Sequence, residues 1–488
     1  MKRTSHRTRE RRKGISVITT TLALMIILPM VGLATDLTIM YILKVKLLTA
    51  LDAGMLAAAR ALGQGPDPST QAQNARNAAA KFFAANFPSG YWGTTNLSFP
   101  TPAIDSTTVP NYRSITGSAS VDAPLYFLRV FGARTSTLRV TAQAARRDAL
   151  VVMVLDRSSS MDRAVAGTGT TACEIMKQDA LEFMTYFAPG RDKLALVVFS
   201  SATFSINPTT NFNPASSSDP LVSAISSIDC QDNTNAVEAL HKAYDLITTN
   251  NETTRANVIV FMTDGIPNGF SGNFIPYRIS PCGTTGTPMV GVLAQWANNA
   301  STGTTAGLMA RSTSSTSGST PYSTENTGSC RFRSDLSLVD TDVTRMPTQD
   351  VYGNALAGTY SSYLNDDVTF FGSPADLTHV DRPQEITKAS ANALDNQATT
   401  IRTNTTFKPM IYTIGLNTDP TGMDNPDEQL LRKIANDPSL ATAPNSGPQI
   451  YQNQKTQPRG IYVNAPDASQ LGAAFETIAT NIVVRLAL

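Results

Sequence analysis

Oxygen-bearing side chains recur in three short segments of this sequence that could together bind a metal ion. The segments are Asp156–Ser160 (DRSSS), Thr234 and Thr263–Gly265 (TDG). Carboxylate and hydroxyl oxygens are the ligands that Mg²⁺ and Mn²⁺ prefer, in octahedral coordination that retains some water. Every second residue of the first segment, beginning with its aspartate, can direct an oxygen to one point. The candidate metal ligands are Asp156, Ser158, Ser160, Thr234 and Asp264.

The ligand types also indicate what such a site would do. Hydroxyl ligands are neutral, so they leave the ion electron-poor and able to attract a further carboxylate from another protein. Each segment alone is weak, because Asp-x-Ser-x-Ser and Thr-Asp-Gly are common in turns and a single threonine is an ordinary helix N-cap. Their joint occurrence, each at the end of a predicted strand, is what predicts a metal site.

Apolar runs and amphipathic helices must position these segments. Ala149–Asp156 is a continuous run of apolar residues, typical of a strand that is buried on both faces of a parallel sheet. Similar runs cover Leu194–Ser201 and Asn257–Asp264, and the pattern of Asn235–Ile247 between them is helical. A further helix over Gln384–Arg402 begins a second series of alternating strands and helices.

This alternation predicts an α/β domain over residues 148–488, with a doubly wound, mostly parallel, Rossmann-like sheet. In such a sheet, ligands bind beyond the carboxyl ends of the strands, near the point where the strand order reverses. All three oxygen-bearing segments map to that edge.

A large insertion over residues 267–382 interrupts the domain, and its Ser/Thr/Gly-rich tract 301–324 is predicted to be flexible. Because the insertion follows Asp264 directly, we expect it to emerge on the metal-bearing face and to shape, cover or regulate the partner surface. Four cysteines permit three pairings in an oxidising compartment. We favour one disulfide within the insertion and one outside it, which pairs Cys282 with Cys330 and Cys173 with Cys230.

The N-terminal residues predict a membrane anchor. Residues 15–34 carry no charge, and about 20 apolar residues match the thickness of a bilayer. Residues 1–14 are a basic tail, so the positive-inside rule keeps this end in the cytoplasm and sends the rest across. We therefore predict a transmembrane helix over 15–36. A cleaved signal peptide is the alternative, since Gly32–Ala34 are small or apolar, but the stretch is longer than a signal core.

Residues 37–147 predict a small α+β region without a chemical motif. Two Ala-rich helical segments, 48–62 and 71–86, are separated by a Gly/Pro break. Residues 96–145 are rich in strand-like alternation. Between two of these strands lies the apolar segment Leu125–Gly132 (LYFLRVFG), which we expect to be either helical or buried.

Composition excludes several classes of function. Lys and Arg number 39 against 38 for Asp and Glu, which argues against a nucleic-acid surface spread over the protein. The chain has 3 histidines and no Walker or GxGxxG motif, so a zinc protease, a histidine triad or a nucleotide site is not supported.

Five segments resemble the framework of von Willebrand factor A domains: VVMVLDRSSSM, LALVVFSS, NTNAVEALHKAYDLI, VIVFMTDGIPN and MIYTIGLN. The resemblance covers about 148–269 and 383–488, although Asp232-Asn233 stand where the family usually has Gly-Gly. The family's metal-ion-dependent adhesion site uses Asp-x-Ser-x-Ser, a threonine and an aspartate. The resemblance thus implies that the five candidate ligands bind Mg²⁺ or Mn²⁺, partly through water. We assign no catalytic residue, because the sequence offers no convincing base or nucleophile near the ion.

The N-terminal segment resembles the membrane segment of TadG-like proteins of Tad (Flp) pilus assembly. Its basic flank, apolar helix, Asp36 and following Asp- and Ala-rich helix have that family's order. Prepilins of such systems carry a glutamate five residues after the cleavage glycine. Thr19 stands there after Gly14, which argues against processing as a pilin.

The resulting prediction is a membrane-anchored, metal-dependent protein-binding or adhesion module that serves pilus assembly or surface attachment. It would lie in the inner membrane with its C-terminal domain in the periplasm or at the cell surface. Its partner would be a pilus or envelope protein that offers a carboxylate, and not a nucleic acid. The alternative is a metal-dependent enzyme, or an enzyme subunit that partners an ATPase, but the sequence shows no base or nucleophile for it. A purely structural envelope protein is the third possibility.

Overall fold

The computed structural model describes residues 11–165, 169–231, 233–274, 289–296, 305–310, 345–358, 374–379, 383–418, 425–442 and 455–486. Two compact units divide the chain. The N-terminal unit comprises Met1–Leu62 and Ser69–Arg146, and the C-terminal unit comprises Gly63–Pro68 and Arg147–Leu486. The basic tail predicted at 1–14 lies mostly outside the described residues, as do Cys282 and Cys330.

A six-stranded sheet forms the centre of the C-terminal unit, in the order β13-β12-β8-β5-β6-β7. Only β7 runs antiparallel to its neighbour. All residues of β5 and β8 are buried, because helices cover both faces of the sheet. The strands are β5 Ala149–Asp156, β6 Lys193–Phe199, β7 Thr203–Thr209, β8 Ala256–Thr263, β12 Met410–Leu416 and β13 Tyr462–Ala465.

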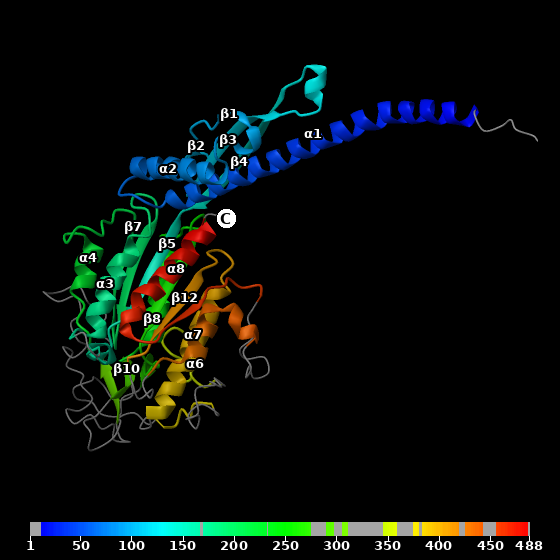
Figure 1. Ribbon diagram of the computed structural model, residues 1–488. Helices are drawn as coiled ribbons and strands as arrows, with labels where there is room; N and C mark the ends of the chain where they lie inside the picture. The colour runs from blue at the N-terminus through cyan, green and yellow to red at the C-terminus, as the bar shows by residue number, and fades with distance from the viewer. Residues whose placement is uncertain are drawn as a thin grey trace, which may run out of the picture. The chain divides into compact units, whose positions relative to one another are not determined.

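Three helices pack on each face of this sheet (Figure 1). One face carries α3 Ala172–Met184, α4 Pro220–Ser226 and α8 Leu471–Leu486. The other carries α5 Ala236–Asn250, α6 Pro383–Arg402 and α7 Glu428–Ala435. Helix α3 begins with a capping box, in which Thr171 and Glu174 satisfy each other's backbone N–H groups. The predicted doubly wound α/β fold is thus confirmed.

The strand order fixes where a ligand site can form. The chain runs from β5 to its neighbour β6 and then crosses to β8 on the other side of β5. The loops after β5 and β8 therefore diverge at the carboxyl edge of the sheet, which is the topological switch point of an open α/β sheet. The loop that precedes α5 reaches the same edge.

Part of the insertion belongs to the domain core. Strands β9 Gly269–Phe274, β10 Met289–Trp296 and β11 Thr305–Ala310 form an antiparallel sheet. The side chains of Phe270 and Leu293 are buried in the same cluster as those of α5 and α6. The flexible tract predicted at 301–324 is therefore wrong for β11, whose backbone pairs with β10, a contact that composition does not reveal. The rest of that tract lies outside the described residues.

One helix, α1 Arg11–Ala61, runs through the predicted membrane segment and the predicted helix at 48–62. The helix continues past residue 36, the predicted end of the membrane segment, because no Gly or Pro interrupts residues 37–53. By length and composition α1 is the one helix of the described chain able to cross a membrane, a test that a signal sequence also passes. The side chains of its first half are largely exposed, whereas Leu43 to Leu62 contribute to a core.

That core also contains helix α2 Pro68–Asn86 and a four-stranded sheet. The strands are β1 Thr95–Ser98, β2 Ala103–Asp105, β3 Tyr112–Pro124 and β4 Thr135–Arg147, with β3 paired to the other three. Buried and more exposed residues alternate along β3, whose inward face packs on α1. The segment predicted as helical or buried forms a short 3-10 helix, Leu128–Phe131, between β3 and β4. The helical alternative is the one that the structure shows, and Val130 and Phe131 on this short helix are exposed.

Candidate metal centre

The loop after β5 is held in place by backbone hydrogen bonds. Asp156, the last residue of β5, is buried, and its Oδ1 accepts the backbone N–H of Ser158 at 2.8 Å. The N–H of Arg157 donates to the carbonyl oxygen of Phe199 at the end of β6 (2.8 Å). The guanidinium of Arg157 donates to the carbonyl oxygen of Asp229 at 3.0 Å. Contacts with the end of β6 and with Asp229 therefore fix the backbone of this loop just before Ser158 and Ser160.

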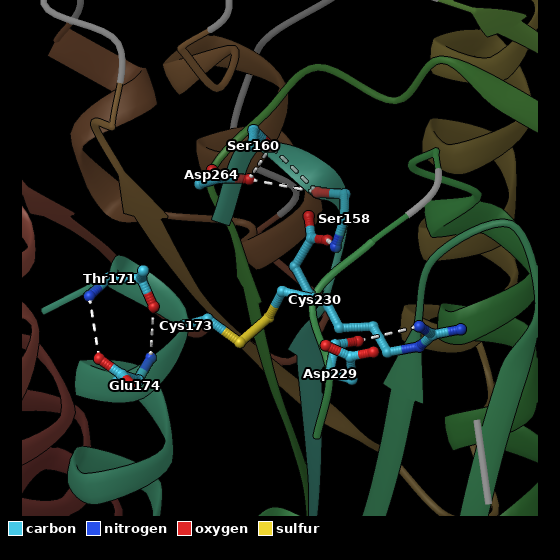
Figure 2. The surroundings of a disulfide bond; sticks show 10 residues. Ser158, Ser160, Thr171, Cys173, Glu174, Asp229, Cys230 and Asp264 are labelled. Carbon is cyan, nitrogen blue, oxygen red and sulfur yellow. Dashed lines mark hydrogen bonds between the residues drawn. A yellow bond between two sulfur atoms is a disulfide. The ribbon is translucent and has the colours of Figure 1, made fainter. Parts of the chain in front are cut away.

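Ser158 and Ser160 meet the carboxylate of Asp264, which follows β8 (Figure 2). The hydroxyl of Ser160 donates to Oδ1 of Asp264 at 2.7 Å, and that of Ser158 lies 3.4 Å from the same oxygen. The two hydroxyl oxygens are 3.1 Å apart. Residues about 100 positions apart in sequence thus gather three oxygens at the carboxyl edge of the sheet, as the motif spacing predicts.

Two buried carboxylates face each other at this edge without a cationic hydrogen-bond partner among the described residues. Asp156 accepts from the hydroxyl of Thr263 (2.5 Å), and Oδ2 of Asp264 accepts from the hydroxyl of Thr418 (2.8 Å). Burial raises the pKa of Asp156, against the effect of its hydrogen bonds. Burial, and then repulsion from Asp156, raise the pKa of Asp264 to about 7. A divalent cation would relieve both the desolvation and the repulsion, so these residues fit one.

Thr234 is joined through its backbone to Asn268, in the loop that follows Asp264. It is buried directly before Asn235, the N-cap of α5. Its N–H donates to the side-chain oxygen of Asn268 at 2.7 Å, and its carbonyl accepts the N–H of Asn268 at 3.1 Å. Because Asn268 follows Asp264 by four residues, the threonine loop is tied to the aspartate loop. The described hydrogen bonds do not join the hydroxyl of Thr234 to the other four candidate ligands.

Sequence reasoning missed three residues that support the site: Thr263, Asn268 and Thr418. Thr263 was visible in the Thr-Asp-Gly segment, but its role depends on β5 and β8 being neighbours. Thr418 follows β12 by two residues, and β12 pairs with β8, so its loop ends at the same edge. No motif marks Thr418 in the sequence. It could have been identified only from its position just after a predicted strand.

A disulfide restrains the segment that contacts the loop after Asp156. Cys173, near the start of α3, is bonded to Cys230, which precedes α5 (Figure 2). The pairing preferred from the sequence for these two cysteines is confirmed. The neighbours of Cys230 on either side contact Arg157: the Asp229 carbonyl accepts its guanidinium, and the Gln231 N–H donates to its carbonyl at 2.7 Å. The crosslink therefore restrains the segment against which the Asp156 loop rests.

The donor set defines the chemistry that is possible here. Two carboxylates and several hydroxyls suit a hard cation with water in its remaining positions. In the described part of the chain no group of three or more His, Cys, Asp or Glu side chains is placed to hold a metal. His241, the histidine of α5, stacks on Tyr352 with ring centroids 3.8 Å apart, and it contacts Gln397. These contacts give His241 a packing role.

Comparison with known proteins agrees with the fold. The family model described as von Willebrand factor type A domain matches residues 151–266, which run from β5 past Asp264. No curated protein sequence matches the chain.

Solved structures similar to the chain include three from pili. The pilus adhesin SpaC of Lactobacillus rhamnosus GG is 13% identical, with 80% of this chain and 35% of that chain covered and a TM-score of 0.37. The PilB minor pilin of Streptococcus sanguinis is 13% identical, with coverages of 81% and 80% and a TM-score of 0.37. The vWF domain of the type V pili tip protein Mfa5 of Porphyromonas gingivalis is 16% identical, with coverages of 70% and 97% and a TM-score of 0.36. This chain thus spans about a third of the SpaC structure.

Proposed function

We propose that this chain is a membrane-anchored protein-binding module that depends on Mg²⁺ or Mn²⁺ and serves pilus assembly or surface attachment. One observation carries the proposal. Asp156 and Asp264 are buried carboxylates whose ionisation is opposed by burial and, for Asp264, also by the charge of Asp156, and the serine hydroxyls bond to Asp264 at the carboxyl edge of the sheet. Together with Ser158, Ser160 and Thr234 they would hold the ion, which supplies a Lewis-acidic position for a partner's carboxylate.

Binding accounts for this donor set better than catalysis does. Metal-assisted hydrolysis needs a base or nucleophile beside the ion. In the described residues, the hydrogen-bonding partners of the two carboxylates are hydroxyls and backbone N–H groups, which position the carboxylates and neither gain nor lose a proton at neutral pH. We therefore infer a non-enzymatic role. No observation favours the enzyme-subunit alternative.

Two features support an anchored, extracytoplasmic placement. A disulfide such as Cys173–Cys230 persists in oxidising compartments. Helix α1 passes Gly32–Ala34 without a break, and the Cβ position of Gly32 lies 2.0 Å from the ring Cγ of Phe127 in the same unit. Cleavage after Ala34 would remove Gly32 from this contact, so an uncleaved anchor fits the packing better than a signal peptide. The basic residues before the helix are what favour the inner membrane with the N-terminus in the cytoplasm.

The proposed binding can be tested with purified surface filaments and the full chain in detergent. We expect the chain to capture filaments or their subunits in Mg²⁺, to release them in chelator, and to lose capture when carboxyl groups of the filaments are amidated with a carbodiimide. The amidation experiment is decisive, because it tests whether a carboxylate of the filament binds at the open coordination position of the metal. Capture that persists in chelator would refute metal-dependent binding.

Metal affinity is expected to fall in acid. In the metal-free protein the pKa of Asp264 is raised to about 7, so below this pH the ion must displace a proton. The association constant for Mg²⁺ should drop about tenfold per pH unit below 7 and level off above it. Calorimetry in buffers of different ionisation enthalpy should also show proton release on binding below pH 7. An affinity that does not change with pH across this range would mean that metal binding displaces no proton from Asp264.

A further inference from the structure

The connection between β3 and β4, residues Leu125–Arg134, presents an apolar and cationic tip. The exposed fractions of Tyr126, Val130 and Phe131 are 60%, 80% and 71%. Arg129 and Arg134 are also exposed on this tip. Single exposed apolar side chains are ordinary, but three large ones within six residues mark a contact surface. Within the N-terminal unit, β3 and β4 carry this tip beyond the shorter strands β1 and β2 (Figure 1).

The tip is held against α1 by two contacts that lie one helical turn apart. The buried carboxylate of Asp36 accepts the backbone N–H groups of Tyr126 (2.9 Å), Phe127 (3.0 Å) and Leu128 (2.8 Å). The ring of Phe127 covers Gly32, where any side chain would collide with it. These contacts hold the tip at one level of the helix while its exposed residues face away from the protein core.

That level is the outer end of the apolar segment of α1. At 1.5 Å per residue, Gly32 lies about 6 Å inside Asp36, the first charged residue after the apolar segment. Around it α1 exposes Val31, Leu33 and Leu37 by 58%, 43% and 55%. In a membrane this position is the boundary between hydrocarbon and lipid headgroups, where aromatic rings and snorkelling arginines are favoured. The apolar surface of the tip is thus continuous with the apolar surface of the helix.

We propose that the β3–β4 tip is a second membrane contact, which inserts Tyr126, Val130 and Phe131 into the outer interface of the bilayer and places Arg129 and Arg134 at lipid phosphates. The inference rests on the proposed membrane anchoring of α1. A single spanning helix leaves the domain it carries free to tilt and rotate. A second contact, docked on the same helix through Asp36 and Gly32, fixes the level and the angle of the N-terminal unit on the membrane.

The test uses the full chain in vesicles of phosphatidylcholine with a minority of phosphatidylglycerol, prepared in two forms: one whose acyl chains carry bromine close to the headgroup, for the tip, and one whose acyl chains carry bromine near their ends, for the helix centre. Three variants each add a tryptophan at an exposed position: Val130→Trp at the tip, Val109→Trp as a control and Leu24→Trp in the helix. Val109 precedes β3, at the end opposite the tip, and a 13-residue strand separates the two by about 40 Å. The native Trp92 and Trp296 give a background common to all variants.

We expect bromolipid to quench the added emission of Val130→Trp and Leu24→Trp strongly and that of Val109→Trp little. Quenching of Leu24→Trp with none at Val130→Trp would overturn the tip contact and leave the anchor intact. If that unquenched tip tryptophan is also shielded from aqueous iodide, a protein covers the tip instead of lipid. Absence of quenching at Leu24→Trp would overturn the anchor and the tip contact together.

Discussion

The Asp156→Ala chain is expected to lose saturable Mg²⁺ and Mn²⁺ binding while it keeps its fold. Asp156 is wholly buried at the end of β5, and its carboxylate would be a direct or water-mediated ligand. Loss of a second-shell group alone costs about 10–100-fold in metal affinity, so loss of this carboxylate should cost more than about 100-fold. Calorimetric titration of the full chain in detergent measures the change.

The fold should survive because the native carboxylate is a cost in the metal-free protein. Burial opposes the ionisation of Asp156, and its charge in turn opposes the ionisation of Asp264, so the alanine removes both costs. The pKa of Asp264 should accordingly fall from about 7 in the variant. Thermal unfolding without metal should be unchanged or shifted upwards, and Mg²⁺ should raise the midpoint of the parent chain only.

Asp162→Ala is the matched control, because Asp162 is an exposed acid in the same loop as Ser158 and Ser160. It should bind metal as the parent does. Equal affinity in the Asp156→Ala chain would place any metal elsewhere in the protein. Loss of binding in both variants would point to the charge of the loop, rather than to a defined ligand.

The central strands could be predicted from the sequence because a strand that is buried on both faces is a continuous run of apolar residues. β5 and β8 consist of continuous apolar runs, and each ends in the polar residues of the site. The proximity of Ser158, Ser160 and Asp264 could be predicted because the carboxyl ends of parallel strands lie at one edge of the sheet. The side chain of Thr234 was placed less well, since its position depends on a loop whose backbone is fixed by Asn268.

Features that depend on tertiary contacts escaped sequence reasoning. The pairing of β11 with β10 overrides a composition that favours a flexible tract. Thr418 joins the site only because β12 lies beside β8. The exposure of Val130 and Phe131 could not be inferred from their apolar character, which predicts burial in a soluble protein. The proposed membrane contact would account for this exposure.

The double variant Cys173→Ala/Cys230→Ala is expected to lose about 4 kcal/mol of unfolding free energy. The disulfide closes a loop of 57 residues, and the chain-entropy relation gives about 4 kcal/mol for that length. Both cysteines are buried, so alanine avoids placing a polar hydroxyl in the core. Replacing both together also avoids an unpaired thiol that could exchange with Cys282 or Cys330. Urea unfolding in chelator, monitored by near-UV circular dichroism, measures the loss.

The same variant should also weaken metal binding several-fold, because Asp229 and Gln231, which flank Cys230, hold Arg157 of the Asp156 loop. Hydrogen exchange separates the two effects: the Gln231 and Arg157 amides should exchange faster in the folded variant than in the parent.

As a control, Arg157→Lys keeps the charge and the disulfide but loses the guanidinium contact, so it should weaken metal binding with little loss of unfolding free energy. A loss below about 1 kcal/mol in the double variant would mean that the unfolded chain is already restrained without the crosslink. Unchanged affinity would show that the Asp156 loop holds its shape through Phe199 and Asp264 alone.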